Sequence, residues 1–420
     1  MKTFAMMVLG CKVNDYEATY LRRKMLERYE EVSFKDKADI YIIFTCCVTN
    51  IAEAKTRKML HRARNTNPDA YIVAIGCLSQ IKGDTEDFKD VDLIIGSTRK
   101  DEVYDLINQH FQDNLVEELK DPGFEDLYLD TYPGKSRAFL KIQDGCNQYC
   151  AYCIIPYARG SERSAQHENI IKQAKVLSET SKELVLTGIH TGRYFDGEYH
   201  LYELLRDLEK IDDLKTIRLS SIEMNEVNDG IVAMIKNSGR IAHHLHIPVQ
   251  SCSNEILTLM NRPYTIEEYT DRIAYIRKEI PDISISTDLI VGFPGETDEI
   301  FEKTLANLKK IRFSFIHVFP YARKKGTAAD KLDVHLPNSV KKSRVNRVIE
   351  IEKGITKEFR KSFIGKQLEM LIEKKEEEYV YGYVKQYFYV KAYGKGEIGD
   401  IVKVRIDSVN DDEVIGNVTE

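Results

Sequence analysis

The chain has 420 residues, of which 43% are hydrophobic and 30% are charged, and its formal net charge is −6 at pH 7. This composition excludes a wholly disordered chain, and the length allows two or three domains. The acidic balance excludes a basic surface over the whole molecule, so any nucleic-acid footprint must be local. The start, MKTFAMMVLGC, is too weakly apolar for a signal peptide, and no later run could span a bilayer, which predicts a cytoplasmic protein without a membrane partner.

Short apolar runs in the first hundred residues alternate with segments whose apolar residues recur at helical spacing. This alternation is typical of parallel strands joined by crossover helices, and it predicts an open α/β sheet. The expected strands are 3–10, 39–45, 70–76 and 91–97, and the expected helices are 15–29 and 51–65.

A cysteine follows each of the first three expected strands: Cys11, Cys46 and Cys77. In a reduced compartment, the chain's eight cysteines are expected to be metal ligands, catalytic groups or buried residues rather than disulfides. Ligands of open parallel sheets bind beyond the carboxyl ends of the strands, near a switch in strand order, so these thiols are expected to converge. The alternative is that each is a buried small hydrophobe. Cys47 is assigned to packing or to an auxiliary position beside Cys46.

An acidic linker at 112–136 leads to a second unit that extends to about residue 323. Six apolar runs in this unit are each followed by a helix-like segment, which predicts an open or partial β/α barrel. The chemistry of such barrels lies at the carboxyl ends of the strands. The expected strands are 137–143, 183–189, 216–222, 244–249, 284–293 and 315–321.

A basic amphipathic helix is expected at 336–363, and the rest of the chain alternates apolar and polar residues with glycine punctuation. That pattern predicts a small antiparallel β-barrel of about sixty residues. The expected fold class is therefore α/β, with an N-terminal open α/β domain at 1–118, a central partial (β/α)6 barrel at 132–362 and the small barrel at 363–420.

The stretch DGCNQYCAYC places Cys146, Cys150 and Cys153 directly after the first strand of the predicted barrel. Structural zinc sites use four ligands, and no fourth is near, because the histidines of HHLHIP belong to a different strand. Iron-sulfur clusters also usually take four thiolates. Three thiolates would leave one iron open to a substrate or cofactor, so the missing ligand is the functional feature.

CNQYCAYC resembles the CxxxCxxC loop of radical S-adenosylmethionine (SAM) enzymes, including the aromatic Tyr152 before the last cysteine. The resemblance implies that the open iron binds the amino and carboxylate groups of SAM. It further implies that an electron from the cluster cleaves SAM to a 5′-deoxyadenosyl radical, while the protein positions the cofactor and excludes water. Cys146, Cys150 and Cys153 are the implied catalytic residues.

The resemblance covers nearly the whole chain and extends to the methylthiotransferase family within that superfamily. In this family the first three-cysteine set holds a second four-iron cluster, so the resemblance implies that Cys11, Cys46 and Cys77 hold one here, and it makes the terminal barrel an RNA-binding TRAM domain. The motifs that carry it are GCKVNDYEA, FTCCVTN, IGCLSQ, DGCNQYCAYCIIPYARG, LTGIHTGRY, LSSIE, HIPVQSCSNEILTLMNRPY and TDLIVGFPGET.

The motif GCKVNDYE is similar to the branch that acts on N6-threonylcarbamoyladenosine at position 37 of tRNA. The isopentenyladenosine branch usually reads GCQMN, and the ribosomal-protein branch reads GCPKN. The chain departs from the family pattern at Phe44, Met224 and Cys252. Phe44 replaces an asparagine near the auxiliary cluster, and Cys252 is interpreted as a tolerated small residue, with a further ligand as the alternative.

Residues at the carboxyl ends of the later barrel strands are candidates for binding SAM, because the rims of such barrels bind ligands. For each, the alternative is ordinary strand capping or an internal hydrogen bond. The candidates are Tyr152 in the cysteine loop and Thr187, Gly188, Ser220, Glu223, Gln250, Asp288 and Gly292 on the rim.

Three local features are candidates for contacting RNA. The basic segments are 55–64, ARKKG and the helix around 341–347, whose lysines and arginines could bind phosphates or simply be solvated. The tyrosines of YVYGYVKQYFYVKAYG could stack on bases of the anticodon loop, although alternation requires about half of such side chains to face the barrel core.

We predict a methylthiotransferase that adds a methylthio group to C2 of N6-threonylcarbamoyladenosine 37 in tRNA, with two [4Fe-4S] clusters and SAM. The expected partners are the tRNA anticodon loop, an electron donor such as flavodoxin or ferredoxin, and a sulfur source. One alternative is the same reaction on isopentenyladenosine or on a ribosomal-protein aspartate. An alternative from another class is a non-catalytic iron-sulfur RNA-binding or electron-transfer protein, which would have two closed clusters.

Overall fold

The computed structural model describes residues 1–83, 85–110, 123–132, 136–411 and 413–419. The chain divides into two compact units, and both contribute to the cysteine loop. The division into three domains stays a prediction, and its boundary at 118 lies outside the described residues. The first unit comprises Met1–Leu129, Lys141–Tyr149 and Cys153–Asn169, and the second comprises Asp130–Leu140, Cys150–Tyr152 and Ile170–Glu420.

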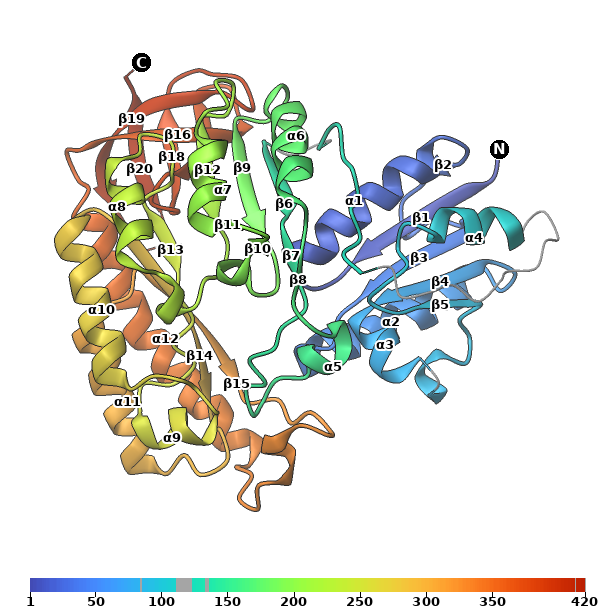
Figure 1. Ribbon diagram of the computed structural model, residues 1–420, viewed down its shortest axis with the longest axis horizontal. Helices are drawn as coiled ribbons and strands as arrows, with labels where there is room; N and C mark the ends of the chain where they lie inside the picture. The colour runs from blue at the N-terminus through green and yellow to red at the C-terminus, as the bar shows by residue number, and fades with distance from the viewer. Residues whose placement is uncertain (84, 111–122, 133–135, 412, 420) are drawn as a thin grey trace. The chain divides into compact units, whose positions relative to one another are not determined.

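The first unit is built on a five-stranded parallel sheet in the order β2-β1-β3-β4-β5 (Figure 1). This confirms the expected open α/β sheet, and the short strand β2 is an addition that its exposed EE sequence did not signal. The elements are β1 (Thr3–Val8), α1 (Lys12–Leu26), β2 (Glu30–Glu31), β3 (Ile40–Thr45), α2 (Asn50–Thr66), β4 (Tyr71–Gly76), α3 (Cys77–Lys82), β5 (Leu93–Ile95), α4 (Val103–His110), β7 (Gln143–Asp144), α5 (Ile155–Arg159) and β8 (Arg163–Ser164).

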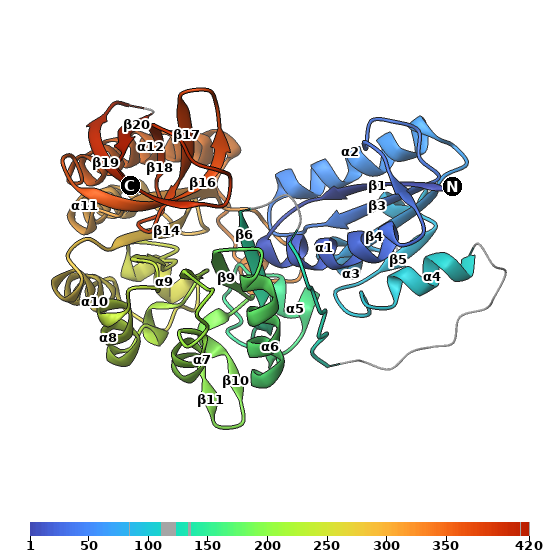
Figure 2. The same ribbon diagram turned by 90° about the horizontal axis from the view of Figure 1, so that it is seen from above.

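Helices cover both faces of this sheet, as Figure 2 shows, with α2 on one face and α1 and α4 on the other. Every residue of β3 is buried, because a central strand of a doubly covered sheet has no solvent face. Alternate residues of the strands enter separate apolar clusters: Tyr41 and Ile43 pack with α2, whereas Ile40 and Ile42 pack with α1 and α4. The continuous apolar runs of the sequence are explained by this two-sided burial.

The second unit contains all six strands expected for the partial barrel. They form two three-stranded sheets, β12-β9-β6 and β13-β14-β15. Isolated bridges from Ile217 to Ile241 and from Ser221 to His246 join β12 to β13, so the six strands follow one another in chain order. The strands are β6 (Arg137–Lys141), β9 (Glu183–Thr187), β12 (Thr216–Leu219), β13 (His244–His246), β14 (Ser284–Val291) and β15 (Phe315–Pro320), with a small hairpin of β10 (Phe195–Asp196) and β11 (Tyr199–His200).

Helices alternate with these strands. The local sequence sets several of their starts: the Thr297 side chain accepts the N–H of Ile300 at the start of α11, and Thr265 and Glu268 form a capping box on α10. Among the described residues, no helix has the length and apolar composition needed to cross a membrane. The helices are α6 (His167–Ser178), α7 (Leu201–Leu208), α8 (Asp229–Asn237), α9 (Asn254–Leu259), α10 (Ile266–Glu279), α11 (Asp298–Ile311) and α12 (Asn338–Lys361).

The C-terminal strands close into a five-stranded barrel in the order β16-β17-β18-β20-β19, which confirms the expected small barrel. Its pairs are antiparallel except for the closing pair, β18 with β20, which is parallel. Glycine is required at Gly382, where a Cβ would lie 1.8 Å from the Leu371 carbonyl oxygen of the neighbouring strand. The strands are β16 (Gln367–Lys375), β17 (Tyr379–Val384), β18 (Tyr389–Tyr393), β19 (Ile401–Val409) and β20 (Val414–Val418).

Candidate functional site

The structure brings the three N-terminal cysteines to one edge of the first unit's sheet. Cys11 follows β1, Cys46 follows β3 and Cys77 begins α3 directly after β4. The order β2-β1-β3 means that β2 lies on one side of β1 and all later strands lie on the other. The strand order therefore reverses between β1 and β3, which is the position where open sheets bind ligands. Burial, together with the nearby thiols of Cys11 and Cys77, raises the pKa of the Cys46 thiol to about 11.

Close backbone approach at this edge depends on Gly10, the residue before Cys11. Gly10 has φ of +103°, and a Cβ there would lie 2.9 Å from the Cβ of Cys46. The Asn14 side chain donates one hydrogen bond to the Leu9 carbonyl at 2.7 Å and another to the Thr45 carbonyl at 3.0 Å. One amide therefore holds the carboxyl ends of β1 and β3 together, next to the two cysteines.

A buried arginine, Arg159 of α5, contacts this cysteine set. Its Nε donates to Cys77 Sγ at 3.2 Å, and its terminal nitrogens donate to Asn14 Oδ1 at 3.0 Å and to Glu17 and Asp144 at 3.1 Å each. Only 2% of Arg159 is exposed. The guanidinium thus presents one N–H to sulfur while its remaining donors are occupied, a geometry that lysine cannot reproduce.

Arg159 belongs to a buried network of three cations and three carboxylates, and the partly exposed Arg163 also pairs with Asp144, at 3.3 Å. Burial alone would raise the pKa of Glu17, but Arg159, Lys100 and Lys141 outweigh it and lower that pKa to about 2. Such a network is stable only while every charge keeps its partner. Its ion pairs are Lys141 with Glu17 (3.0 Å) and Asp144 (2.9 Å), Lys100 with Glu17 (3.2 Å) and Glu125 (3.2 Å), and Arg159 with Glu17 and Asp144 (3.1 Å each).

Cys77 is the thiol of this set that is most readily ionised. A hydrogen bond from Cys47 lowers its pKa, and against the opposing effect of burial Arg159 lowers it further, to about 6. Cys47 is buried, and its hydrogen bond to Cys77 makes it a neighbour of that thiol as well as of Cys46, the residue before it. Since the thiolate is the form that binds metal, this lowered pKa suits Cys77 to the role of a cluster ligand.

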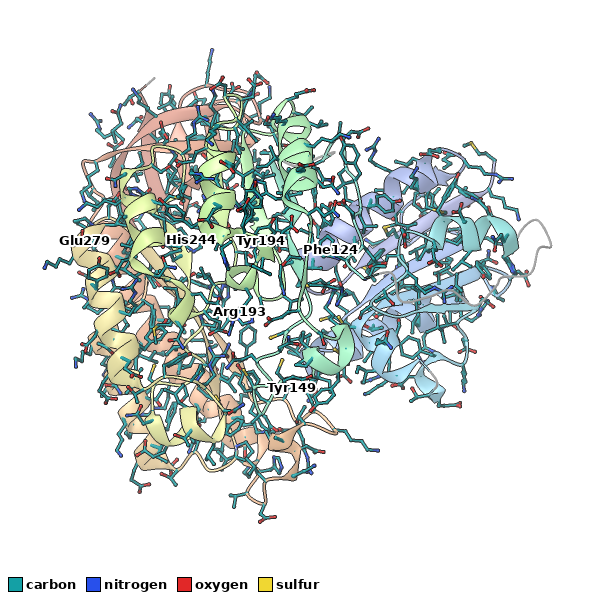
Figure 3. All side chains as sticks on the ribbon, viewed as in Figure 1. Phe124, Tyr149, Arg193, Tyr194, His244 and Glu279 are labelled. Carbon is teal, nitrogen blue, oxygen red and sulfur yellow. The ribbon has the colours of Figure 1, made fainter. Side chains whose placement is uncertain are left out.

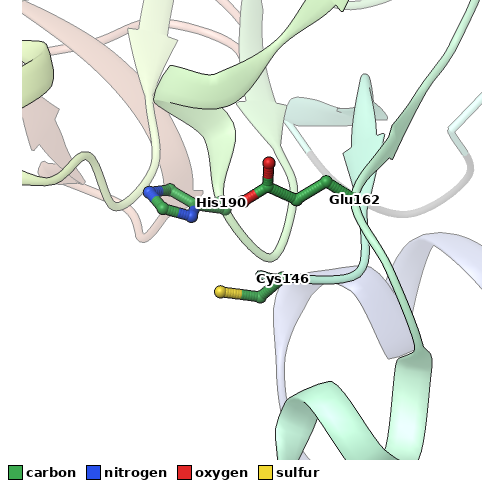
Figure 4. Close-up of side chains that lie close together, drawn as sticks. All are labelled: Cys146, Glu162 and His190. Carbon is green, nitrogen blue, oxygen red and sulfur yellow. The ribbon is translucent and has the colours of Figure 1, made fainter. Parts of the chain in front are cut away.

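The loop that carries Cys146, Cys150 and Cys153, called the radical loop here after the resemblance of its CxxxCxxC motif, is anchored by backbone and side-chain contacts within each unit. In the first unit, Cys146 N donates to the Gly160 carbonyl at 3.1 Å, and Gln148 N lies 3.4 Å from Cys146 Sγ. Asn147 N donates to Glu162 Oε1 at 3.2 Å, which fixes the segment after Cys146. Figure 4 draws Cys146 and Glu162 of this unit, together with His190 of the second unit.

In the second unit, a second buried arginine donates to a cysteine. Arg262 Nη1 lies 3.3 Å from Cys150 Sγ, while Nη2 pairs with Glu223 and donates to the Tyr264 hydroxyl at 2.8 Å. The next residue, Ala151, donates to the Met260 carbonyl at 2.9 Å and accepts from Ala329 N at 2.8 Å. Cys150 is thereby held at a defined position, with a positive charge beside its sulfur.

Sequence reasoning singled out neither arginine. Arg159 stands in the quoted motif CAYCIIPYARG and Arg262 in NRPY. Their separation from the cysteines that they contact is 82 residues for Arg159 and 112 for Arg262. The signal available was their presence in those motifs, because a buried arginine requires anionic partners.

Most of the predicted rim residues lie at or beyond the carboxyl ends of their strands, whereas Asp288 lies within β14. Thr187 is the last residue of β9, Gly188 follows it, and Ser220 follows β12. Ser220 lies 3.0 Å from the Thr191 hydroxyl, so it already has a protein partner. Tyr152 packs against the apolar cluster that contains Phe293.

The structure brings Gln250 and Asp288 together through their backbones. Gln250 N donates to the Asp288 carbonyl at 2.9 Å, and Ile290 N donates to the Gln250 carbonyl at 2.8 Å. Gln250 has φ of +61°, a conformation that is uncommon for a residue with a side chain and that often occurs at functional sites.

Gly292 is tied to the basic helix α12. Gly292 N donates to Glu296 Oε2 at 2.5 Å, and the same carboxylate accepts from Arg344 of α12 at 2.6 Å. Lys341 packs over Gly292, where a Cβ would lie 2.5 Å from its Cγ, and donates to the Tyr321 carbonyl. Lys341 and Arg344 are both buried. The suggestion that these two residues contact RNA phosphates is therefore wrong, because they hold the rim in place.

Cys252 is completely buried, and burial raises its pKa. Neighbouring thiols act on the pKa of Cys46, whereas burial is the only cause of the shift at Cys252, which favours the interpretation of Cys252 as a small core residue.

Comparisons with known proteins agree with these features. A model of the Radical SAM superfamily matches residues 140–308, and a model of an uncharacterized protein family, UPF0004, matches residues 3–96. The threonylcarbamoyladenosine tRNA methylthiotransferase of Bacillus subtilis (strain 168) is 38% identical over 423 residues, which cover 97% of this chain and 94% of that protein. The chain belongs to the radical SAM methylthiotransferase family.

Other relatives of this methylthiotransferase extend the comparison. The tRNA-2-methylthio-N(6)-dimethylallyladenosine synthase of Thermodesulfovibrio yellowstonii is 35% identical over 430 residues, a match that covers 100% of this chain and 98% of that protein. The solved structure of the radical SAM methyltransferase TsrM from Kitasatospora setae, with cobalamin and a [4Fe-4S] cluster bound, has a TM-score of 0.57 at 14% identity. It covers 78% of this chain and 77% of that chain, which shows a shared fold.

The protein is thus a transferase whose cofactors are [4Fe-4S] clusters and SAM. The cysteine sets suit these groups: three thiols converge in the first unit, one with a pKa of about 6. In each set, one sulfur accepts a hydrogen bond from a buried arginine. Such N–H donors to sulfur are among the features by which proteins tune iron-sulfur clusters.

Proposed function

We propose that this methylthiotransferase replaces the C2 hydrogen of N6-threonylcarbamoyladenosine at position 37 of tRNA with a methylthio group. The observation that carries the proposal is the similarity over 97% of the chain to a relative named for this nucleoside. The motif GCKVNDYE at residues 10–17 supports the same substrate. A relative named for dimethylallyladenosine covers the chain at 35% identity, so isopentenyladenosine is the second candidate.

In this proposal Cys146, Cys150 and Cys153 hold the cluster that binds SAM, and Cys11, Cys46 and Cys77 hold the auxiliary cluster. When bound, the first cluster supplies the electron that cleaves SAM to a 5′-deoxyadenosyl radical. The proximity of Cys11, Cys46 and Cys77 and the N–H donors of Arg159 and Arg262 to sulfur support this assignment.

The rim residues would bind and orient SAM. Gln250, whose backbone N–H and carbonyl already pair with Asp288 and Ile290, is a candidate through its side chain, and Gly292 is a candidate for shaping the turn after β14. Glu223, paired with the arginine that contacts Cys150, is a candidate for the amino group of SAM. The remaining candidates are Tyr152, Thr187, Gly188, Ser220 and Asp288.

The reaction also requires an electron and a sulfur atom from outside this chain. The proposed electron donor is a flavodoxin or ferredoxin, and a separate sulfur source supplies the methylthio sulfur. We assign the reaction to the cytoplasm, because its proposed substrate is tRNA.

Tyrosines on the outer face of the C-terminal barrel support binding of tRNA there. Registered pairs place Tyr379 opposite Tyr393 and Tyr383 opposite Tyr389, while the alternate residues Val380 and Val390 are buried. Tyr389 and Tyr393 are exposed. Lys391 lies over the Tyr379 ring. An exposed surface that combines aromatic rings with lysine suits stacking on unpaired bases together with phosphate contacts.

A second RNA surface is proposed on α2, where the charges of 55–64 divide by role. Arg57 pairs with Asp87 and Arg64 with Asp92, so these two already have partners within the protein. Lys55, Lys58 and Arg62 are exposed and lie three and four residues apart, hence on one helix face. This face, called the α2 basic face, suits contacts with tRNA phosphates.

Replacing Lys55, Lys58 and Arg62 together by glutamate should weaken tRNA binding and flatten its salt dependence. Each lost phosphate contact is expected to reduce the slope of log Kd against log salt by about 1. The measurement is a filter-binding or anisotropy titration at several salt concentrations. A charge-matched variant, Lys278→Glu, Lys309→Glu and Lys310→Glu on the exposed faces of α10 and α11, should retain the original slope. Equal slopes for the two triple variants would show that tRNA does not contact the α2 basic face.

The proposed function is tested by incubating the anaerobically reconstituted protein with SAM, a reductant and tRNA that carries N6-threonylcarbamoyladenosine. Nucleoside mass spectrometry should show a methylthio mass gain on that nucleoside. A parallel reaction uses tRNA that carries isopentenyladenosine, for which no gain is expected.

The two products separate the possible failures. If 5′-deoxyadenosine forms and only isopentenyladenosine gains mass, the chemistry stands and the substrate is wrong. If neither product forms with verified iron content, the proposed function is wrong.

A further inference from the structure

Strand β15 carries a row of exposed rings on one face. Phe315, His317 and Phe319 alternate along the strand, so their side chains point to the same side of the sheet. Phe315 is 37% exposed and Phe319 is 38% exposed, and His317 is also exposed. Ile316, which points to the opposite side, is buried, and α12 packs against β14 and β15. The exposed rings therefore belong to a face that the helix does not cover.

Two of these rings contact each other, and the row continues onto strand β13. Phe315 and His317 meet edge to face with their centroids 4.5 Å apart, and His317 meets His246 of β13 at 5.7 Å. The register places Asp288 of β14 directly beside His317. Phe315, His317, Phe319 and His246, called the ring platform here, thus lie on the two outer strands of one sheet, β15 and β13, on either side of β14.

The imidazole of His246 is held in a fixed orientation. Its Nδ1 lies 2.9 Å from Ser286 Oγ, and its Nε2 lies 3.4 Å from Asp288 Oδ1. Ser286 also lies 3.0 Å from His244 Nε2, the buried histidine labelled in Figure 3. His244 and His246 share one face of β13, because alternate residues of a strand point to the same side and both imidazoles contact Ser286. The platform is preorganised at its His246 end.

The ligand atoms of His246, Asp288 and His317 lie within 4.8 Å of one another, a separation that would also suit a metal ion. A metal would gain nothing from the two exposed phenyl rings that flank His317. Exposed aromatic rings on a sheet, with a carboxylate at their edge that accepts hydrogen bonds, instead match the requirements of an unpaired nucleobase. The strands concerned also lead directly to the rim: Gln250 follows β13, and Gly292 follows β14.

We propose that the ring platform is a stacking subsite for a nucleobase of the tRNA anticodon loop, with Asp288 accepting hydrogen bonds from the base edge. This inference rests on the proposed function, because that function supplies the RNA. The platform positions the loop by stacking on a base face and contacts no phosphate. Its loss therefore lowers RNA affinity without changing the number of phosphate contacts.

The test uses the full-length reconstituted protein and anticodon stem-loop RNAs that carry 2-aminopurine at position 37 or at either neighbour, one site per RNA. Stacking on protein rings changes the 2-aminopurine fluorescence. The test variant is Phe315→Leu with Phe319→Leu, which keeps apolar bulk but removes the rings. The control is Phe195→Leu, because Phe195 is an exposed phenylalanine on β10, outside the platform.

For at least one of the three RNAs, the wild-type protein should change the fluorescence on binding, and the double variant should lose that change and bind about 5- to 150-fold more weakly. The salt dependence of binding, the iron content and the RNA-independent formation of 5′-deoxyadenosine should stay as in the wild type. The control variant should match the wild type in every measurement.

Equal fluorescence changes and equal affinities for the double variant and the control would overturn the proposal. So would a wild-type complex in which none of the three probes changes. Failure of the proposed function is recognised separately: the stacking signal then persists, while the threonylcarbamoyladenosine nucleoside gains no methylthio mass.

Discussion

Replacing Cys150 with alanine should abolish 5′-deoxyadenosine formation and methylthio transfer together. The thiol is one of only three cysteines in the radical loop, so its loss leaves two thiolates, too few to hold a four-iron cluster with one open iron. The iron content per chain should fall by about half, because the auxiliary set is untouched. Iron analysis and chromatographic detection of 5′-deoxyadenosine under anaerobic conditions check both expectations.

Two other cysteine variants make this result specific. Cys252→Ala removes another buried thiol and should keep full iron content and activity, at a cost of about 1 kcal/mol of folding stability. Cys46→Ala should lose methylthio transfer but retain 5′-deoxyadenosine formation, because it disrupts only the auxiliary set. If Cys150→Ala kept its radical activity, or if Cys252→Ala lost it, the assignment of the radical cluster would be refuted.

Replacing Arg159 with methionine should lower the free energy of unfolding by about 3–5 kcal/mol. The side chain is buried, and its removal leaves Glu17 and Asp144 short of positive charge and Asn14 without its donor. Urea unfolding of the iron-free protein, which excludes the contribution of metal binding, measures the effect. Far-ultraviolet circular dichroism is the suitable signal, because the chain has no tryptophan.

A surface arginine of the same unit is the matched control. Arg57 forms a half-exposed ion pair with Asp87 at 3.4 Å, so Arg57→Met should cost about 0–1 kcal/mol. Arg159→Lys should lie between the two, because an ammonium keeps the charge but cannot contact Cys77, Asn14 and both carboxylates at once. Equal unfolding free energies for Arg159→Met and Arg57→Met would show that the buried network does not stabilise the fold.

Several features of this protein could be predicted from local sequence. Continuous apolar runs with helical segments between them indicate a parallel sheet, and β3, which is buried along its whole length, explains why that signal was clear. A cysteine directly after each of β1, β3 and β4 has its place set by its own strand, so the meeting of Cys11, Cys46 and Cys77 followed from the rule on strand ends. The alternation of tyrosine and valine similarly indicated the C-terminal barrel.

Local signals failed where two elements distant in sequence must meet. The short strand β2 is formed by exposed glutamates that pair with β1, and the parallel pair of β18 with β20 follows from barrel closure. The basic residues of α12 were expected from the sequence to be solvated or to bind RNA. Lys341 and Arg344 are instead buried against the Gly292 turn and Glu296. Amphipathic periodicity reports which side of a helix is polar, but it does not report what covers that side.

The sequence by itself determined the protein's family, its two sets of three cysteines and the strands that carry them. Motif spacing and strand period are local properties, so they can be recognised in the sequence without knowledge of the fold. Only the tertiary structure decided that Arg159 and Arg262 each donate to a cysteine sulfur, and that His317 lies beside His246 and Asp288. These contacts join residues far apart in the chain, and a buried charge or an exposed ring acquires its meaning from the neighbours that folding brings to it.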